Sequence, residues 1–151
     1  MVYLFAAILV LILTFGGVIL RGAPYLPTLN AQAKAALDLL NLKPGQTLLE
    51  LGSGDGKVLL AAAQAGLNVV GVELNPFLVI VSWLRTRRYR KQVRIIWGDF
   101  WRGDWPEADA IFTFLLTKYM KKLDNKIVQY KHKPGKPITA EKSGVYLYTY
   151  R

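Results

Sequence analysis

The stretch T-L-L-E-L-G-S-G-D-G-K, residues 47–57, decides the fold of this 151-residue chain. An apolar strand over residues 47–51 carries an acid, Glu50, and continues into glycines at positions 52, 54 and 56. A helix-like run follows, from Val58 to Ala65. Glycines at a strand-to-helix turn permit positive φ and let a ligand approach the backbone closely. The stretch therefore predicts an open α/β sheet with a ligand site at the carboxyl end of this strand.

The spacing of the glycines indicates which ligand. A dinucleotide-binding turn reads G-x-G-x-x-G, and its third glycine lets the helix pack closely. This chain has E-x-G-x-G-x-G, with Lys57 where a dinucleotide fold has that glycine. An acid that opens the loop suits a ligand with a cationic amine and a sulfonium better than a pyrophosphate. A glycine turn without any ligand remains the alternative from this motif alone.

Strands and helices alternate along the chain. We expect a helix from Thr28 or Asn30 to Leu40, and a helix that begins at Asn75-Pro76, because proline suits a first turn. A lysine-rich helix is expected over 118–129, and strands over 47–51, 68–74, 93–97, 108–116, 137–140 and 144–150. Alternation predicts a Rossmann-like, mostly parallel sheet with helices on both faces.

Acids follow the first three predicted strands. Glu73 ends the second strand, where a carboxylate can accept both ribose hydroxyls of a nucleoside. Asp99 ends the third strand, where it can accept the adenine amino group while Phe100 covers the ring. Glu50, Asp55, Glu73 and Asp99 are four of only ten acids in a chain of net charge +10. Their shared edge of the sheet favours an adenosyl site over helix capping alone.

The first twenty residues predict a transmembrane anchor. No charged residue occurs before Arg21, and twenty helical residues span roughly 30 Å, the thickness of a bilayer core. A cleaved secretory signal is the alternative, but no basic residue precedes the apolar run. We therefore divide the chain into an anchor (1–20), a linker (21–30) and a binding domain (31–151). Because Lys and Arg follow the anchor, the domain is expected on the cytoplasmic or an equivalent face.

Charge predicts the partner of the binding domain. Six Lys and Arg residues lie between Arg85 and Arg94, and eight lie between Lys118 and Lys142. A basic domain tethered to a membrane is attracted to anionic lipid head groups. We find no aromatic-basic motif that favours nucleic acid, and a merely solvated basic face remains an alternative. The chain contains no cysteine, which agrees with a reducing compartment.

These motifs together resemble those of the class I S-adenosylmethionine-dependent methyltransferases. E-L-G-S-G-D-G-K resembles the first motif of that family, V-E-L-N-P its second acidic position and W-G-D-F its adenine-side acid. With P-Y-L-P-T at residues 24–28, the chain is similar to the membrane-anchored lysine methyltransferases of the ATP synthase c-subunit or the adenine nucleotide translocase. The resemblance covers residues 21–116 well, and the turn at residues 133–135 and the final V-Y-L-Y more loosely.

The resemblance implies a cofactor, S-adenosylmethionine, and a set of residues that hold it. The implied cofactor-binding residues are Glu50, Gly52, Ser53, Gly54, Asp55, Gly56, Glu73, Leu74, Asp99 and Phe100. Tyr25 and Thr28 would lie over the site, and with Phe114 and Tyr119 they are the candidate substrate residues. No catalytic base and no metal site is predicted.

The expected function is methylation of a lysine side chain in a membrane protein. A short tail after the fourth predicted strand puts the acceptor in doubt more than the cofactor. The residues F-L-L-T at 114–117 stand where amino-group methyltransferases of another type carry N-P-P-Y, which disfavours adenine, cytosine or glutamine as the acceptor. A methyltransferase for a lipid or small hydrophobic molecule, and a non-catalytic membrane-anchored nucleoside-binding domain, remain the alternatives.

Overall fold

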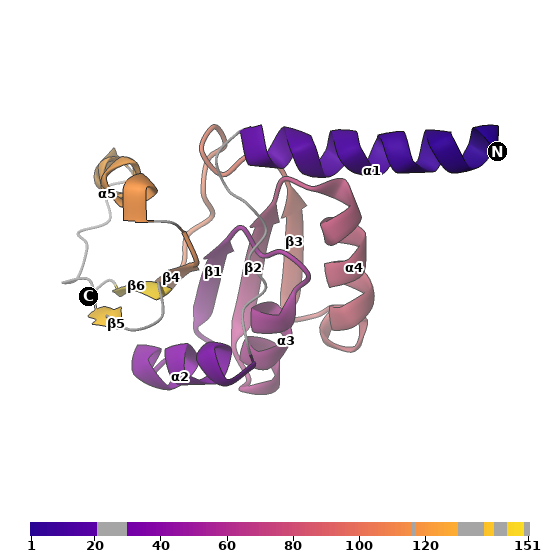
Figure 1. The fold of residues 1–151 in the computed structure, drawn as a ribbon. Helices are drawn as coiled ribbons and strands as arrows, with labels where there is room; N and C mark the ends of the chain where they lie inside the picture. The colour runs from indigo at the N-terminus through magenta and orange to yellow at the C-terminus, as the bar shows by residue number, and fades with distance from the viewer. Residues whose placement is uncertain (21–29, 116, 130–137, 141–144, 150–151) are drawn as a thin grey trace.

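A six-stranded sheet forms the centre of the computed structural model, which describes residues 1–20, 30–115, 117–129, 138–140 and 145–149 (Figure 1). The strand order is β3-β2-β1-β4-β6-β5. The first four strands are parallel, whereas β6 pairs antiparallel with β4 and β5 pairs antiparallel with β6. In chain order the strands are β1 (Thr47–Leu51), β2 (Asn68–Glu73), β3 (Val93–Trp97), β4 (Ala110–Thr113), β5 (Ile138–Ala140) and β6 (Val145–Thr149).

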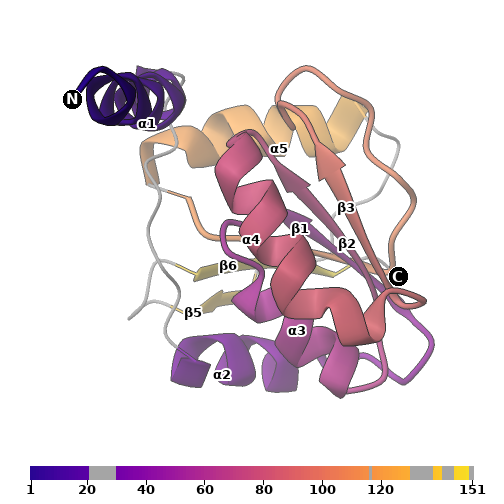
Figure 2. The same cartoon turned by 90° about the vertical axis from the view of Figure 1, so that its right-hand side faces the viewer.

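Helices cover both faces of the parallel strands (Figure 2), which confirms the predicted α/β architecture. The helices α2, α3 and α4 lie on one face, and α5 lies on the other. Their bounds are α2 (Asn30–Leu40), α3 (Lys57–Gln64), α4 (Pro76–Thr86) and α5 (Met120–Gln129), with short 3-10 turns η1 (Arg87–Tyr89) and η2 (Thr117–Tyr119). Helix α3 connects the parallel strands β1 and β2, and α4 connects β2 and β3. Each is therefore the crossover helix of a βαβ unit.

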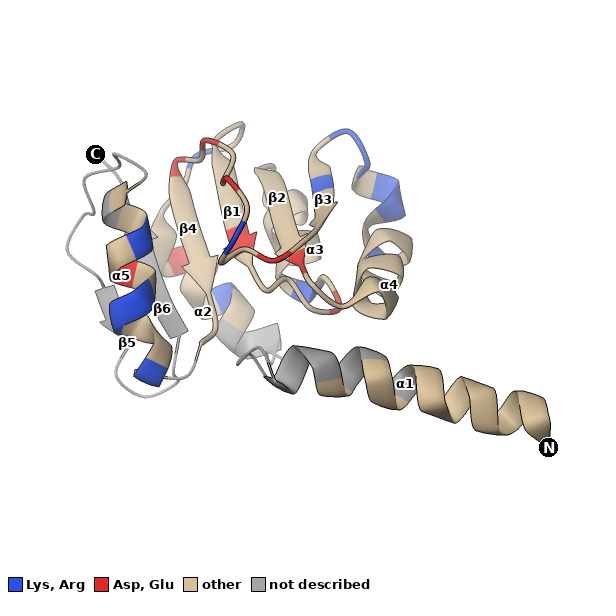
Figure 3. Ribbon diagram, turned by 90° about the horizontal axis from the view of Figure 1, so that it is seen from above, with Lys and Arg blue, Asp and Glu red and all other residues tan. Residues whose placement is uncertain are grey.

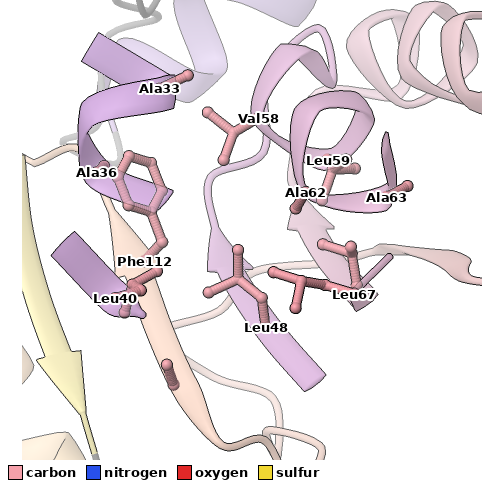
Figure 4. Close-up of a cluster of buried hydrophobic side chains, with 12 residues drawn as sticks. Ala33, Ala36, Leu40, Leu48, Val58, Leu59, Ala62, Ala63, Leu67 and Phe112 are labelled. Atoms are coloured by element: carbon pink, nitrogen blue, oxygen red, sulfur yellow. The ribbon is translucent and has the colours of Figure 1, made fainter. Parts of the chain in front are cut away.

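Two apolar clusters fill the space between the sheet and these helices. The first joins α2 and α3 to the sheet, with Leu48, Leu59 and Phe112 at its centre (Figure 4). The second packs Leu123 and Ile127 of α5 against alternate residues of the same strands. Side chains of a strand alternate between the two faces of the sheet, so the consecutive apolar residues of β1 contribute to both clusters. This pattern is typical of a parallel strand that helices cover on both faces.

The locally encoded boundaries agree with the sequence predictions. The observed β1, β3 and α2 begin and end at the expected residues, and Asn75 caps α4 by accepting hydrogen bonds from the Phe77 and Leu78 amides. The predicted strand 108–116 is shorter, because the register of β4 pairs only Ala110 to Thr113 with residues 48–51 of β1. The lysine-rich helix begins as the 3-10 turn η2 before α5.

The N-terminal segment is a separate apolar helix, α1 (Val2–Leu20) (Figure 1). Its described large side chains are exposed, for example Tyr3 at 90% and Leu13 at 64%. A search of the helices in the described ranges finds none with both the length and the apolar character that crossing a membrane requires. The structure therefore does not support the predicted transmembrane anchor. Of the predicted linker, residues 21–30, all but Asn30 lie outside the described residues, and Asn30 begins α2.

Gly71 lets α3 and the glycine loop pack closely on β2. A Cβ at this position would lie 2.8 Å from Leu59 Cδ1 and 2.8 Å from Ser53 Cβ. This glycine in the neighbouring strand thus provides the close approach that a dinucleotide turn obtains from its own third glycine.

We expect Gly71→Ala to lower the free energy of unfolding by about 1–3 kcal/mol, because the added methyl group overpacks the interface between α3 and the sheet. Gly98→Ala is the matched control, since a Cβ at that position meets nothing within 4 Å. Urea denaturation of both variants tests the prediction. Equal stability of the two variants would show that the close approach at Gly71 is not required.

Candidate functional site

The glycine loop, residues 52–56, leaves β1 and curls over the end of β2. Gly52, Gly54 and Gly56 all have positive φ, at 79°, 54° and 77°. The Gly52 and Ser53 amides both donate to the Val72 carbonyl, at 2.9 and 3.1 Å. Since side chains rarely adopt this backbone conformation, glycine is required for the tight return of the chain. The loop therefore lies at the carboxyl edge of the sheet, as predicted.

Glu73 holds this loop to the end of β2. Its Oε2 accepts a hydrogen bond from the Gly54 amide at 2.8 Å, and its Oε1 accepts one from the Asn75 amide at 2.7 Å. Burial raises the pKa of the Glu73 carboxyl, although backbone hydrogen bonds from Asn75, Gly54 and Leu74 act in the opposite direction. Each carboxylate oxygen has two acceptor positions, so Glu73 can also accept hydroxyl donors such as those of a ribose.

Glu50 is a buried acid without a complete set of partners. Glu50 is 4% exposed, and no described residue donates a hydrogen bond to its Oε2 atom. Burial raises the pKa of Glu50 well above its ordinary value, and the negative charges of Glu73 and Asp55 raise it further. Ser53 Oγ in the glycine loop is also buried and without a hydrogen-bond partner in the described part of the chain. A cationic ligand at this edge would supply what Glu50 lacks, because a positive charge stabilises the ionised carboxylate.

Helix α4 contacts the glycine loop through the side of the helix that faces the sheet. Arg85 Nη1 donates to Asp55 Oδ2 at 2.8 Å, and Lys57 Nζ lies 3.6 Å from the same oxygen. Gly56 packs directly against Ser82, and an added Cβ would lie 3.0 Å from the Ser82 Cα atom. Asp55 is therefore paired with two cations, Arg85 from α4 and Lys57 from the start of α3.

The loop after β3 completes the edge. Asp99 Oδ1 accepts a hydrogen bond from the Trp101 amide at 2.9 Å, and the buried Phe100 ring approaches Gly52, where an added Cβ would lie 3.9 Å from Phe100 Cε1. Trp105 Nε1 donates to the Phe100 carbonyl at 2.8 Å, and Lys126 Nζ donates to the Trp101 carbonyl at 2.7 Å. Figure 3 shows acidic segments gathered at these strand ends, and basic segments on α5 and after α4.

The structure brings the predicted cofactor residues together more completely than the predicted substrate residues. The predicted loop and strand-end residues share the carboxyl edge, and the Leu74 carbonyl there accepts a hydrogen bond from Trp97 Nε1 at 3.0 Å. Phe114 and Tyr119 pack against the first and the second apolar cluster, so they lie toward opposite faces of the sheet. Tyr25 and Thr28 lie outside the described residues.

Sequence reasoning missed the residues that position the site. Arg85, Ser82 and Lys126 contact the glycine loop or the loop after β3 from elements that lie 23 to 30 residues away in the chain. The small Ser82 in a helix of large apolar residues was a signal of close packing, and Gly56 was its partner. The Arg85 contact has no local signature, because it lies in a run of six basic residues.

Comparisons with known proteins show which sequences and folds this chain resembles. A family model described as the ANTKMT methyltransferase domain matches residues 50–141. The chain is 34% identical over 108 residues to the lysine N-methyltransferase of the ATP synthase c-subunit from Xenopus laevis, covering 69% of this chain and 46% of that protein. It is 33% identical over 107 residues to the adenine nucleotide translocase lysine N-methyltransferase of Mus musculus, covering 69% and 46%.

Among solved structures, an RNA methyltransferase from Salinibacter ruber in complex with S-adenosyl-L-homocysteine matches with a TM-score of 0.68 at 23% identity, over 83% of this chain and 92% of that chain. This match shows that the two proteins share a fold. The chain spans about half the length of the curated relatives that it matches.

The raised pKa of Glu50 predicts a pH dependence of stability. The folded chain keeps this proton to a higher pH than the unfolded chain, whose value is about 4.5. The protonated Glu50 carboxyl therefore contributes fully to stability below about pH 4.5, and this contribution is lost as the pH rises through the pKa of Glu50 in the folded chain. Glutamine cannot ionise, so only the wild-type chain loses this stability as the pH rises. Without ligand, we expect the melting temperature of Glu50→Gln minus that of the wild type to increase by a few degrees between pH 4 and 8, at roughly 2–4 °C for each kcal/mol.

Glu107→Gln is the control for this measurement, because Glu107 is exposed. Thermal melts followed by circular dichroism at several pH values suffice. A Glu50→Gln difference that does not change with pH would contradict the assignment of a raised pKa to Glu50.

The Asp55–Arg85 pair predicts a second effect. We expect Arg85→Met to lower the free energy of unfolding by about 1 kcal/mol, since the pair is partly buried and Lys57 remains near Asp55. Arg94→Met, at an exposed position, should change it by less than about 0.5 kcal/mol. Chemical denaturation compares the variants, and an equal effect of the two would argue against a stabilising role of the pair.

Proposed function

We propose that this chain, which belongs to the ANTKMT methyltransferase domain family, is an S-adenosylmethionine-dependent methyltransferase that modifies a lysine side chain of a membrane protein. The family match confirms the resemblance seen in the sequence motifs. The observation that carries the proposal is Glu50, a buried carboxyl group with an unpartnered oxygen among the described residues, beside a glycine loop of positive φ. That combination fits a ligand which is cationic at one end.

The residues at the carboxyl edge fit the proposed cofactor in three parts. Glu50 and the glycine loop suit the methionine half, because its ammonium and sulfonium groups carry positive charge. Glu73 suits the ribose, and Asp99 with Phe100 suits the adenine. Bound in this way, S-adenosylmethionine supplies a methyl group activated by its sulfonium. Orientation of the acceptor then becomes the main task of the protein, and orientation can contribute roughly 7–11 kcal/mol.

A lysine acceptor places a second demand on the site. The amine has an ordinary pKa of about 10.4, so its deprotonation at neutral pH costs roughly 4–5 kcal/mol. An apolar or aromatic surrounding lowers that pKa by desolvating the ammonium. Because Phe114 and Tyr119 pack toward opposite faces of the sheet, the two do not form one such wall. We assign no catalytic residue.

We further propose that α1 attaches the domain to a membrane from its cytoplasmic or equivalent face. The support is the absence of charge over residues 1–20 and the exposure of large apolar side chains along α1. Attachment would keep the site in the plane where a membrane-protein lysine lies, and thereby raise the effective concentration of the acceptor. Resistance to carbonate extraction from membranes tests the attachment.

Two alternatives remain distinguishable by experiment. A methyltransferase for a lipid or small hydrophobic molecule suits the same attachment, and the methyl label would then extract into organic solvent. A non-catalytic nucleoside-binding domain would bind the cofactor without transfer.

The test uses isotope transfer from labelled S-adenosylmethionine to isolated membranes. We expect label in a membrane-protein band, with the modified residue identified as lysine by mass spectrometry. We expect Glu73→Ala to lose at least about tenfold in affinity for S-adenosylhomocysteine, equivalent to about 1.4 kcal/mol. The variant loses the proposed ribose acceptor, and it loses the two hydrogen bonds that hold the glycine loop and the start of α4 in place.

Glu107→Ala is the matched control, since it also removes one acid but from an exposed position. Tight cofactor binding without label in any protein, lipid or nucleic acid would contradict the enzymatic proposal. Absence of cofactor binding by the wild-type chain would contradict both the enzyme and the nucleoside-binding alternative.

A further inference from the structure

The outward face of α4 is apolar, contrary to the usual pattern of a surface helix. Leu78, Ser82 and Thr86 are buried toward the sheet. The opposite arc carries large exposed apolar side chains: Phe77 at 50%, Ile80 at 57%, Trp83 at 61% and Leu84 at 50%. At 100° per residue these four fall within an arc of roughly 120°, where a helix on a solvated surface has polar residues.

Trp97 extends this face onto the sheet. It belongs to β3, the edge strand, and it alternates with Val93 and Ile95, which pack on the α2–α4 side. Trp97 is 68% exposed, while its Nε1 donates to the Leu74 carbonyl just before α4. We call the five residues Phe77, Ile80, Trp83, Leu84 and Trp97 the α4 surface.

Basic residues border the α4 surface directly. The segment 85–94 contains six Lys and Arg residues and no acid. Arg85 pairs with Asp55, whereas Arg87, Arg88, Arg90 and Lys91 are exposed just after α4. Arg94 is also exposed, but it alternates with Val93 and Ile95 on β3 and so faces the other side of the sheet. Figure 3 shows α4 without charge up to its last turn, and basic segments from there onward. The adjacency of exposed tryptophan, aliphatic side chains and arginine defines the chemistry of the partner.

We propose that the α4 surface docks into the interfacial layer of an anionic lipid bilayer. Tryptophan and aliphatic side chains enter the boundary between head groups and acyl chains, while the arginines bind the phosphates of anionic lipids. This inference rests on the proposed membrane location of the chain. It adds that the α4 surface makes the contact and that the lipids carry negative charge. A second copy is a poorer occupant, because a two-fold contact here would bring two basic clusters together.

Docking through α4 has a consequence for the site. The capped start of α4 lies next to Glu73, whose Oε1 accepts from the amide of the cap residue Asn75. A bilayer seated along α4 would therefore adjoin the carboxyl edge of the sheet. An acceptor lysine at the level of the lipid head groups would then be close to the site without leaving its membrane.

The absence of cysteine from the sequence makes a direct test possible. Single cysteines introduced as Ile80→Cys and Trp83→Cys in the full chain are labelled with an environment-sensitive fluorophore. Leu39→Cys is the matched control, because Leu39 is an apolar side chain on α2 that is 49% exposed. The probes are phosphatidylcholine vesicles with and without phosphatidylglycerol, and quenching lipids report the depth of the label.

We expect labels at 80 and 83 to shift their emission to the blue and to be quenched from the bilayer, only when phosphatidylglycerol is present. The label at 39 should keep its aqueous emission. Arg87→Gln with Arg88→Gln should weaken the docking equilibrium roughly 25-fold, at about fivefold for each neutralised arginine. Lys34→Gln with Lys43→Gln, an equal change of charge at exposed positions on or near α2, should leave it unchanged.

Several results would overturn docking. These are an aqueous signal at 80 and 83 in vesicle-bound protein, equal responses at 39, 80 and 83, or a blue shift that depends on protein concentration without vesicles, which would indicate self-association. Calorimetry with S-adenosylhomocysteine on the same labelled proteins separates this failure from a failure of the proposed function. Cofactor binding that persists in undocked protein would leave the cofactor site intact and reject only the lipid surface.

Discussion

The burial of a carboxyl group, Glu50, at the end of the central parallel strand is the constraint on which the arrangement depends. A sheet covered on both faces offers this group little water, and burial with two neighbouring negative charges raises its pKa. Burial also raises the pKa of Glu73, but the Gly54 and Asn75 amides donate hydrogen bonds to its carboxylate, which thereby holds the glycine loop over β2. One acid thus organises the backbone, and the other retains capacity for a cation. This difference supports the proposal that the edge binds a cationic ligand.

The sequence predicted those parts of the fold that local chemistry determines. The bounds of β1 follow from an apolar run that meets glycines, and the start of α4 follows from Asn75-Pro76, whose cap the structure confirms. The length of β4 depended on its register with β1 and β6, which periodicity does not encode. Likewise, the contacts of Arg85 with Asp55 and of Gly71 with Ser53 join distant segments. The candidate substrate residues Phe114 and Tyr119 lie toward opposite faces of the sheet, an arrangement that depends on how the chain continues after β4 and not on local sequence.

Helix α4 contacts the glycine loop on one side and carries the proposed lipid-binding surface on the other. The inner side of α4 supports the loop through Ser82 and Arg85, and its outer side presents Ile80 and Trp83. The apolar run at residues 77–84 is typical of a core helix, yet only one side of α4 is buried. A helix of this kind can couple the position of the lipid surface to the loop that would hold the cofactor.

The most direct test of the central claim is the proton exchange that accompanies cofactor binding. Calorimetry with S-adenosylmethionine near neutral pH, in buffers of different ionisation enthalpy, measures it. If the cation of the ligand meets Glu50, binding lowers the pKa of that carboxyl, so the wild-type chain releases a proton and Glu50→Gln releases less. Binding whose enthalpy is independent of the buffer, or equal proton release by both proteins, would contradict the account.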